Sequence, residues 1–179
     1  ERGITVVQVS HSREEAFALA DRVVVIIGGR LVQTGTCDEV FFHPATSEVA
    51  RFSGIENILQ GTVTRNNGMT MDVDVNGQVF RAEGNTPSGE RVTLCIRGTD
   101  VQICPVSNPP GPHQTRLNGV INGITPMEHS LRVAVQGPVP LVAILPRDDA
   151  SRSLSSGQIV TIVIDAAAAG VIPSEREKI

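Results

Sequence analysis

The stretch GERVTLCIR, residues 89–97, recurs later in the chain as GQIVTIVID, residues 157–165. Each copy begins at a glycine and continues into β-branched and apolar residues, which favour a strand. A second pair of landmarks precedes them, LQGTV at residues 59–63 and LNGVI at residues 117–121. Because both landmarks occur in the same order, residues 55–172 contain an internal duplication, and a repeated unit sets the fold of this part of the chain.

Between its landmarks each copy carries a strand of alternating apolar and polar residues, at residues 69–75 and 131–135. Tight turns are expected directly after these strands, at Asn76-Gly77 and at residues 136–138, because Gly and Asn accept a positive φ. Alternating strands joined by close turns predict antiparallel sheets that curl into small OB-like barrels. The sequence PPGP at residues 109–112 predicts a stiff linker between the copies.

Residues 1–54 show a different pattern, in which helix starts alternate with short strands. Residues 4–9 form a β-branched run that predicts a buried parallel strand. Two capping boxes, Ser12 to Glu15 and Thr36 to Glu39, predict helix starts. Residues 23–27 and 30–34, separated by two glycines, predict a hairpin, and residues 47–53 predict a last short helix.

The fold class expected is therefore mixed, a truncated α/β unit followed by mainly β barrels. We expect the end of an α/β domain at residues 1–54 and a first barrel half at residues 55–104. A linker at residues 105–113, a second barrel half at residues 114–172 and a tail at residues 173–179 complete the predicted organisation.

Residues 9–23, VSHSREEAFALADRV, resemble the switch-histidine segment of ABC transporter ATPases. In that family a strand ends in a Thr/Ser-His pair and is followed by Glu-Ala and then Leu-Ala-Asp-Arg-Val. The continuation GGRLVQTG, residues 28–35, is similar to the end of an importer nucleotide-binding domain. The resemblance covers residues 3–54 and implies that His11 is a catalytic residue that contacts the γ-phosphate of ATP in the full-length subunit.

The segments that bind and hydrolyse ATP in this family are missing from the sequence. A P-loop needs the pattern G-x-x-x-x-G-K-[ST], but the chain has no Gly-Lys pair, and its one lysine is Lys178. The Walker B carboxylate and the ABC signature motif are absent as well. We therefore expect a carboxy-terminal fragment of a longer ATPase. ATP and Mg would be bound by the full-length subunit, whereas the fragment alone is expected to hold no cofactor and to hydrolyse no ATP.

The duplicated region resembles the regulatory TOBE region of ABC importers, and its second copy is similar to the molbindin-like module of molybdate and tungstate importers. The resemblance implies an oxyanion ligand, for which Thr115, Arg116 and Asn118 are the candidate residues. Where the module has a lysine and a serine, however, this chain has Asp165 followed by alanines. Because a carboxylate repels a dianion, the sequence favours a barrel kept for packing and dimer contacts. No metal site is expected, because His113 and His129 are too isolated to form a ligand set.

By resemblance, the intact subunit would be a homodimer at the cytoplasmic face of the membrane, peripheral to it and bound to membrane permease subunits. No nucleic acid partner is expected. One alternative is an OB-type barrel that binds single-stranded nucleic acid, which needs stacking aromatics and a basic groove. The chain has 3% aromatic residues and a net charge of −4. A second alternative is a free-standing anion-binding barrel protein, which would have no use for the His11 segment.

Overall fold

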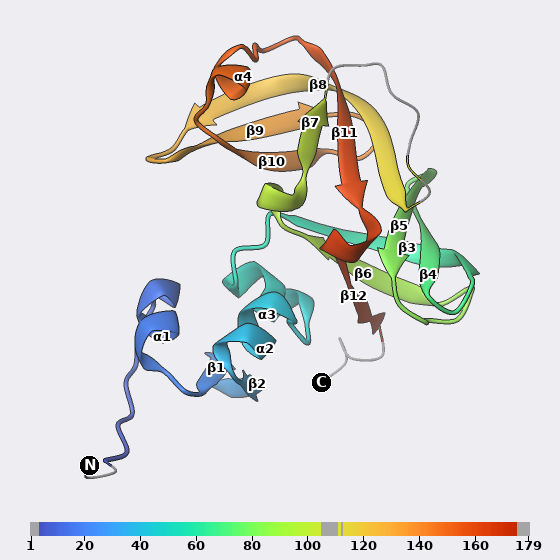
Figure 1. The fold of residues 1–179 in the computed structure, drawn as a ribbon. Coiled ribbons are helices and arrows are strands. Elements are labelled where there is room, and N and C mark those ends of the chain that lie inside the picture. Colours follow the sequence, from blue (N-terminus) through green and yellow to red (C-terminus); the bar gives the residue numbers. More distant parts are fainter. Residues whose placement is uncertain (1–3, 105–110, 112, 175–179) are drawn as a thin grey trace.

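The computed structural model describes residues 4–104, 111 and 113–174. A small amino-terminal segment, residues 4–54, is followed by a barrel region, residues 55–174, that contains two five-stranded antiparallel sheets. Figure 1 shows the amino-terminal segment in blue and cyan below the two sheets, with the last of its helices beside the first sheet. The expected mixed but mainly β fold is confirmed.

The amino-terminal segment contains three short helices and one hairpin. Helix α1 spans Arg13–Leu19, α2 spans Cys37–Phe42 and α3 spans Ser47–Phe52. The hairpin consists of β1, Val23–Ile27, and β2, Arg30–Gly35. Its positions agree with those predicted from residues 23–34.

The two predicted capping boxes differ in how completely they form. At α2 the Thr36 hydroxyl accepts from the Glu39 amide at 3.2 Å, and the Glu39 carboxylate accepts from the Thr36 amide at 2.8 Å. At α1 the Ser12 hydroxyl accepts from the Glu15 amide at 3.1 Å, but the Glu15 carboxylate accepts from the Ser10 hydroxyl. The box is therefore complete at α2 and half formed at α1.

The prediction of a buried strand at residues 4–9 is wrong. This run has no regular secondary structure, and its side chains are exposed, with Val7 and Val9 each at 89%. A strand needs a neighbour to satisfy its backbone N–H and C=O groups. No strand in the described part of the chain pairs with residues 4–9, so their strand propensity alone does not produce a strand.

The first sheet of the barrel region has the strand order β12-β6-β3-β4-β5, and the second has the order β10-β9-β8-β11-β7. The elements of the first copy are β3 (Asn57–Asn66), β4 (Thr70–Val75), β5 (Gln78–Glu83), β6 (Arg91–Ile96), the 3₁₀ turn η1 (Gly98–Asp100) and β7 (Gln102–Cys104). Those of the second are β8 (Gln114–Pro126), β9 (Ser130–Gln136), β10 (Leu141–Pro146), α4 (Asp149–Arg152), β11 (Ile159–Asp165), the 3₁₀ turn η2 (Ala166–Ala168) and β12 (Ala169–Pro173). Each copy thus gives its last strand to the sheet of the other copy.

The Leu-x-Gly landmark of each copy marks a place where the backbones of two strands come close. A Cβ atom on Gly61 would lie 2.6 Å from the carbonyl oxygen of Asp74, and one on Gly119 would lie 2.9 Å from that of Gln136. Both glycines precede a register shift between the first two strands of their copy, β3 and β4 in the first and β8 and β9 in the second. The landmark is therefore a packing requirement that recurs in each copy.

The turn predicted at Asn76-Gly77 joins β4 to β5. Asn76 has a φ of 52° and Gly77 a φ of 78°, the left-handed values that a two-residue hairpin turn needs. The predicted linker, residues 105–113, lies mostly outside the described residues, as does most of the predicted tail at residues 173–179.

One hydrophobic cluster runs through both sheets, so the two copies share a core. Its members include Val63, Met71, Val73, Phe80 and Leu94 from the first sheet and Ile121, Val133, Leu141, Ile162 and Ile164 from the second. The amino-terminal segment has a smaller cluster of its own, in which Val25, Val40 and Val49 are buried.

Candidate functional site

His11 lies in a bend immediately before α1, and its side chain is exposed. The neighbouring Ser12 caps the helix, and backbone hydrogen bonding together with the Ser12 side chain lowers the pKa of Glu14. Glu14 and Glu15 are both carboxylates of the first turn of α1. Among the described residues, none forms a hydrogen bond or an ion pair with the His11 side chain.

The three candidate oxyanion residues do not converge on one side of the sheet. Thr115 is buried, and its hydroxyl oxygen accepts a hydrogen bond from the Arg81 amide of β5 at 2.7 Å. Side chains alternate along a strand, so Arg116 and Asn118 point to the opposite face of β8 from Thr115. Asn118 accepts from the Thr161 hydroxyl at 3.0 Å. Arg116 has a buried Nε with no hydrogen-bond partner among the described residues.

Asp165, expected to disfavour an anion, lies at the end of β11. Its carboxylate accepts a hydrogen bond from the Gln114 side chain at 2.9 Å, beside the start of β8. Asp165 and Gln114 are register partners in the β8–β11 pairing. Register partners share a face of the sheet, so the Asp165 carboxylate lies on the face of β8 that carries Arg116 and Asn118, opposite to that of Thr115.

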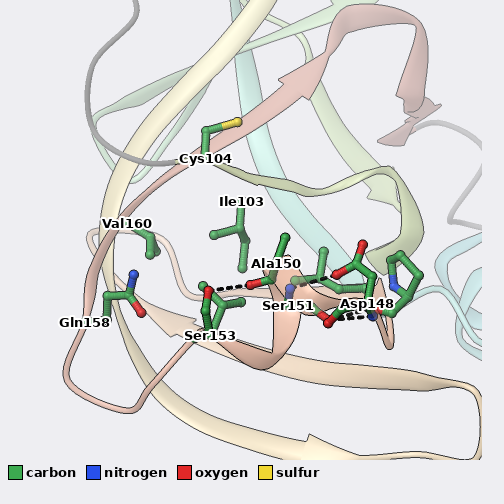
Figure 2. Close-up of a pocket in the computed structure, with 11 residues that line it drawn as sticks. Ile103, Cys104, Asp148, Ala150, Ser151, Ser153, Gln158 and Val160 are labelled. Carbon is green, nitrogen blue, oxygen red and sulfur yellow. Dashed lines mark hydrogen bonds between the residues drawn. The ribbon is translucent and has the colours of Figure 1, made fainter.

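A cavity of about 280 Å³ opens between β7, β11 and the connection that contains α4. Figure 2 shows Ile103, Cys104 and Val160 on one side of it and Asp148, Ala150, Ser151 and Ser153 on the other. Its serine hydroxyls already have partners within the protein: the Ser151 hydroxyl donates to the Pro146 carbonyl at 2.6 Å, and the Ser153 hydroxyl donates to the Ala150 carbonyl at 2.7 Å.

The charge of this cavity also opposes an anionic ligand. Asp148 caps α4 by accepting from the Ser151 amide at 2.7 Å, and hydrogen bonds from Ser151 lower the pKa of Asp148. The group is thus a carboxylate at neutral pH. No arginine, lysine or histidine is among the described residues that line the cavity, so no cationic side chain there offsets the charge of Asp148.

The described part of the chain contains neither a metal-binding cluster nor a helix that could span a membrane. Within residues 4–104 and 113–174 no three His, Cys, Asp or Glu side chains are grouped closely enough to hold a metal ion. His113 and His129 are both exposed, and His129 lies 3.5 Å from the carboxylate of Glu128. None of the described helices has the length and apolar character needed to cross a bilayer.

The amino-terminal segment is attached to the barrel region by a contact that the sequence did not reveal. Arg97, which follows β6, donates from Nη2 to the carbonyl of Phe41, and its guanidinium carbon lies 4.6 Å from the ring centroid of Phe42. Both phenylalanines belong to the end of α2. Arg97 and its partners on α2 are far apart in the sequence, so this contact depends on the tertiary fold.

An apolar contact accompanies the arginine. Ala50 of α3 packs with Ile55, with Cys95 of β6 and with Ile172 of β12. All four side chains are buried, so the helix that ends the amino-terminal segment covers one side of the first sheet. In Figure 1 α3 lies below β6 and to the left of β12.

Comparisons with curated proteins connect this chain with the ATP-binding subunits of importers. The spermidine/putrescine import ATP-binding protein PotA of Oleidesulfovibrio alaskensis is 43% identical over 104 residues, covering 56% of this chain and 28% of the relative. The molybdate/tungstate import ATP-binding protein WtpC of Thermococcus kodakarensis is 41% identical over 108 residues, 55% of this chain and 33% of the relative. The Fe(3+) ions import ATP-binding protein FbpC of Streptomyces avermitilis is 54% identical over 103 residues, 58% of this chain and 28% of the relative.

A solved structure matches the fold over a larger share of the chain. The cytoplasmic molybdate-binding protein ModG superposes with a TM-score of 0.55 at 18% identity, covering 65% of this chain and 96% of that one. At this identity the likeness concerns the fold alone. No family model matches the chain. The match spans about a third or less of the length of these curated relatives. The chain is thus partly homologous to the carboxy-terminal region of ABC importer ATP-binding subunits, and it carries a barrel region with the molbindin fold.

Proposed function

We propose that this chain is the carboxy-terminal part of an ABC importer ATP-binding subunit, in which the barrel region is the regulatory and dimerisation unit. The longer protein would couple ATP hydrolysis to solute uptake as a homodimer bound to permease subunits at the cytoplasmic face of the membrane. ATP and Mg would bind in the longer protein, with His11 at the γ-phosphate.

The observation that carries this proposal is the direct attachment of the barrel region to a segment resembling the end of an ATPase domain. Arg97 binds the end of α2 and Ala50 packs on the first sheet. A regulatory unit must be able to pass its state to the catalytic domain, and these contacts supply a physical route for it. The partial homology to import ATP-binding proteins supports the same assignment.

The role of His11 is testable in the longer protein. We expect His11→Ala to lower ATP turnover by at least about 100-fold, the size typical of losing a positioned group at the reacting phosphate, while ATP affinity changes little. The measurement is steady-state phosphate release together with nucleotide binding. His113→Ala, which alters an exposed histidine of the barrel region, serves as the matched control. Near-normal turnover in the His11 variant would contradict the assignment.

The comparisons leave the solute open, because they include importers of polyamines, molybdate or tungstate, and iron. We propose that the barrel region itself does not bind molybdate or tungstate tightly. Asp165 lies beside the candidate residues, Thr115 is engaged by the Arg81 amide, and the cavity beside α4 presents a carboxylate.

This second proposal is tested by titration calorimetry of the 179-residue chain with molybdate and tungstate, and with sulfate as the comparison anion. We expect no saturable heat at low-micromolar anion. Low-micromolar binding of either metal oxyanion would refute the proposal. If binding is found, Arg116→Ala and Asn118→Ala would show whether it involves the face of β8 on which these two side chains lie.

A further inference from the structure

The turn η1 carries the contact between the barrel region and α2. Arg97 precedes η1, and its side chain donates to the Phe41 carbonyl and covers the ring of Phe42. The last carbonyls of a helix have no partner within the helix, and a positive charge at that end is favourable. Arg97 therefore supplies both a hydrogen bond and a complementary charge to the end of α2.

The other side of the same turn is packed against the second sheet. Gly98 is buried, and a Cβ atom there would lie 2.6 Å from Cγ1 of Ile144 and 3.2 Å from the Ile144 amide nitrogen on β10. The Gly98 amide donates to the Glu56 carboxylate at 2.8 Å. The turn is thus enclosed between β10 and the residues that connect α3 to β3.

A buried asparagine fixes β10 at this place. The Asn57 side chain accepts from the Val142 amide at 2.7 Å and donates to the Val142 carbonyl at 2.9 Å, and it also donates to the Ile96 carbonyl at 3.1 Å. Because Asn57 belongs to β3, Val142 to β10 and Ile96 to β6, one side chain joins three strands from the two sheets. The side of the barrel region that faces α2 is therefore tied to β10 by direct hydrogen bonds.

We propose that β10, η1 and Arg97 form a conformational link through which the second sheet controls the end of α2. Arg97 is the positioning residue of this link. A displacement of β10 moves Gly98, since no space separates them, and Arg97 is the adjacent residue in the chain. The link goes beyond the proposed function, because it involves only this chain and neither ATP nor solute, so either can fail without the other.

Contiguous contacts alone do not demonstrate coupling, so the link has to be perturbed at a distance from α2. The readout is amide hydrogen exchange of α2 in the 179-residue chain. Arg97→Ala is the reference variant, which removes the contact itself. We expect it to raise the exchange rate at the end of α2 about tenfold, as for the loss of one hydrogen bond from a charged donor. Arg91→Ala, which alters an exposed arginine at the other end of β6, is the matched control and should leave α2 unchanged.

The decisive variant is Gly98→Ala, which alters neither Arg97 nor its two partners on α2. It should raise the exchange rate at the end of α2 at least about threefold, compared with about tenfold for Arg97→Ala. Gly170→Ala, on β12 beside β6, adds a methyl at ordinary contact distance of 3.4 Å and should have no effect. Because Gly98→Ala can prevent folding, Ile144→Ala is made as well; it loosens η1 by removing the side chain on which Gly98 rests.

A second readout uses the absence of tryptophan from the sequence. In a Phe42→Trp background the single indole reports on the guanidinium above it, and its emission should shift to the red when Arg97 or the Gly98–Ile144 contact is altered. The proposal is overturned if the folded Gly98 or Ile144 variants leave α2 exchange and the indole emission as in the parent chain. It is equally overturned if Arg97→Ala itself has no effect on α2.

Discussion

The amino-terminal segment and the barrel region contain similar apolar residues but bury them to very different extents. Val7 and Val9 are each 89% exposed, whereas Val73 and Phe80 are 0% exposed. The difference does not lie in the residue types, since β-branched runs occur in both. It lies in the availability of partner strands, because every strand of the barrel region has a hydrogen-bonded neighbour and residues 4–9 have none among the described residues.

The largest expected effect contrasts one buried and one exposed apolar residue. Phe80→Ala removes a ring from the shared core and should lower the free energy of unfolding by about 3–5 kcal/mol. Val7→Ala in the same chain should change it by less than about 0.5 kcal/mol, because no buried surface is lost. Urea denaturation followed by circular dichroism measures both. A large effect of Val7→Ala would mean that residues 4–9 are packed in solution, which would remove the contrast.

A smaller effect distinguishes the two capped helices. Thr36→Ala removes a complete capping box from α2, whose Val40 and Phe41 are buried, and should cost about 1–2 kcal/mol. Ser12→Ala removes half a box from α1, which has no buried residue, and should cost less than about 0.5 kcal/mol of global stability. Thr125→Ala, at an exposed strand position, is the control. Equal losses at the two caps would show that α1 is as firmly packed as α2.

The smallest effect concerns Asp100, in the turn that joins the two regions. Burial raises its pKa, with Arg97 opposing the rise and Glu56 adding to it. When folding raises the pKa of a carboxyl, ionisation of that carboxyl destabilises the folded state. The free energy of unfolding should therefore fall as the pH rises from the ordinary aspartate pKa, about 4, through the raised pKa of the folded state. Asp100→Asn should remove this loss, which we expect to be less than about 1 kcal/mol because the carboxyl is only partly buried.

Urea denaturation of both proteins over a series of pH values tests this prediction. The stability difference between Asp100→Asn and the parent should grow in favour of the variant as pH rises, and then become constant. A difference of the opposite sign, with the variant less stable at neutral pH, would mean that the Arg97 charge outweighs the cost of burial at Asp100.

Local chemistry made part of the fold predictable from sequence. The Asn76-Gly77 turn and the Thr36 capping box depend on residues within four positions of one another, and both form as predicted. Strands β4 and β9 were predictable from alternation, because each packs one face against the shared core. Strands β6 and β11 are buried along nearly their whole length, and runs of β-branched and apolar residues indicated them instead. The duplicated landmarks indicated two copies of one unit, and the close approach at Gly61 and Gly119 gives the physical reason for them.

What escaped prediction depends on contacts between distant residues. Strand propensity at residues 4–9 could not reveal that no described strand pairs with them. The hydrogen bond from Arg97 to the Phe41 carbonyl joins residues far apart in sequence, and no local pattern encodes it. The candidate ligand residues are neighbours in sequence, but strand alternation directs Thr115 and Arg116 to opposite faces. Whether any of the three binds a ligand is still a prediction.

The exchange of β7 and β12 between the sheets has a consequence for how the protein is made. The first sheet contains residues 57–96 but is completed by β12, Ala169–Pro173, close to the end of the described chain. During synthesis the edge of β6 that pairs with β12 therefore stays unpaired until β12 has left the ribosome. A break between residues 104 and 113 would leave each half one strand short, so the two copies are expected to fold, unfold and be degraded as one unit.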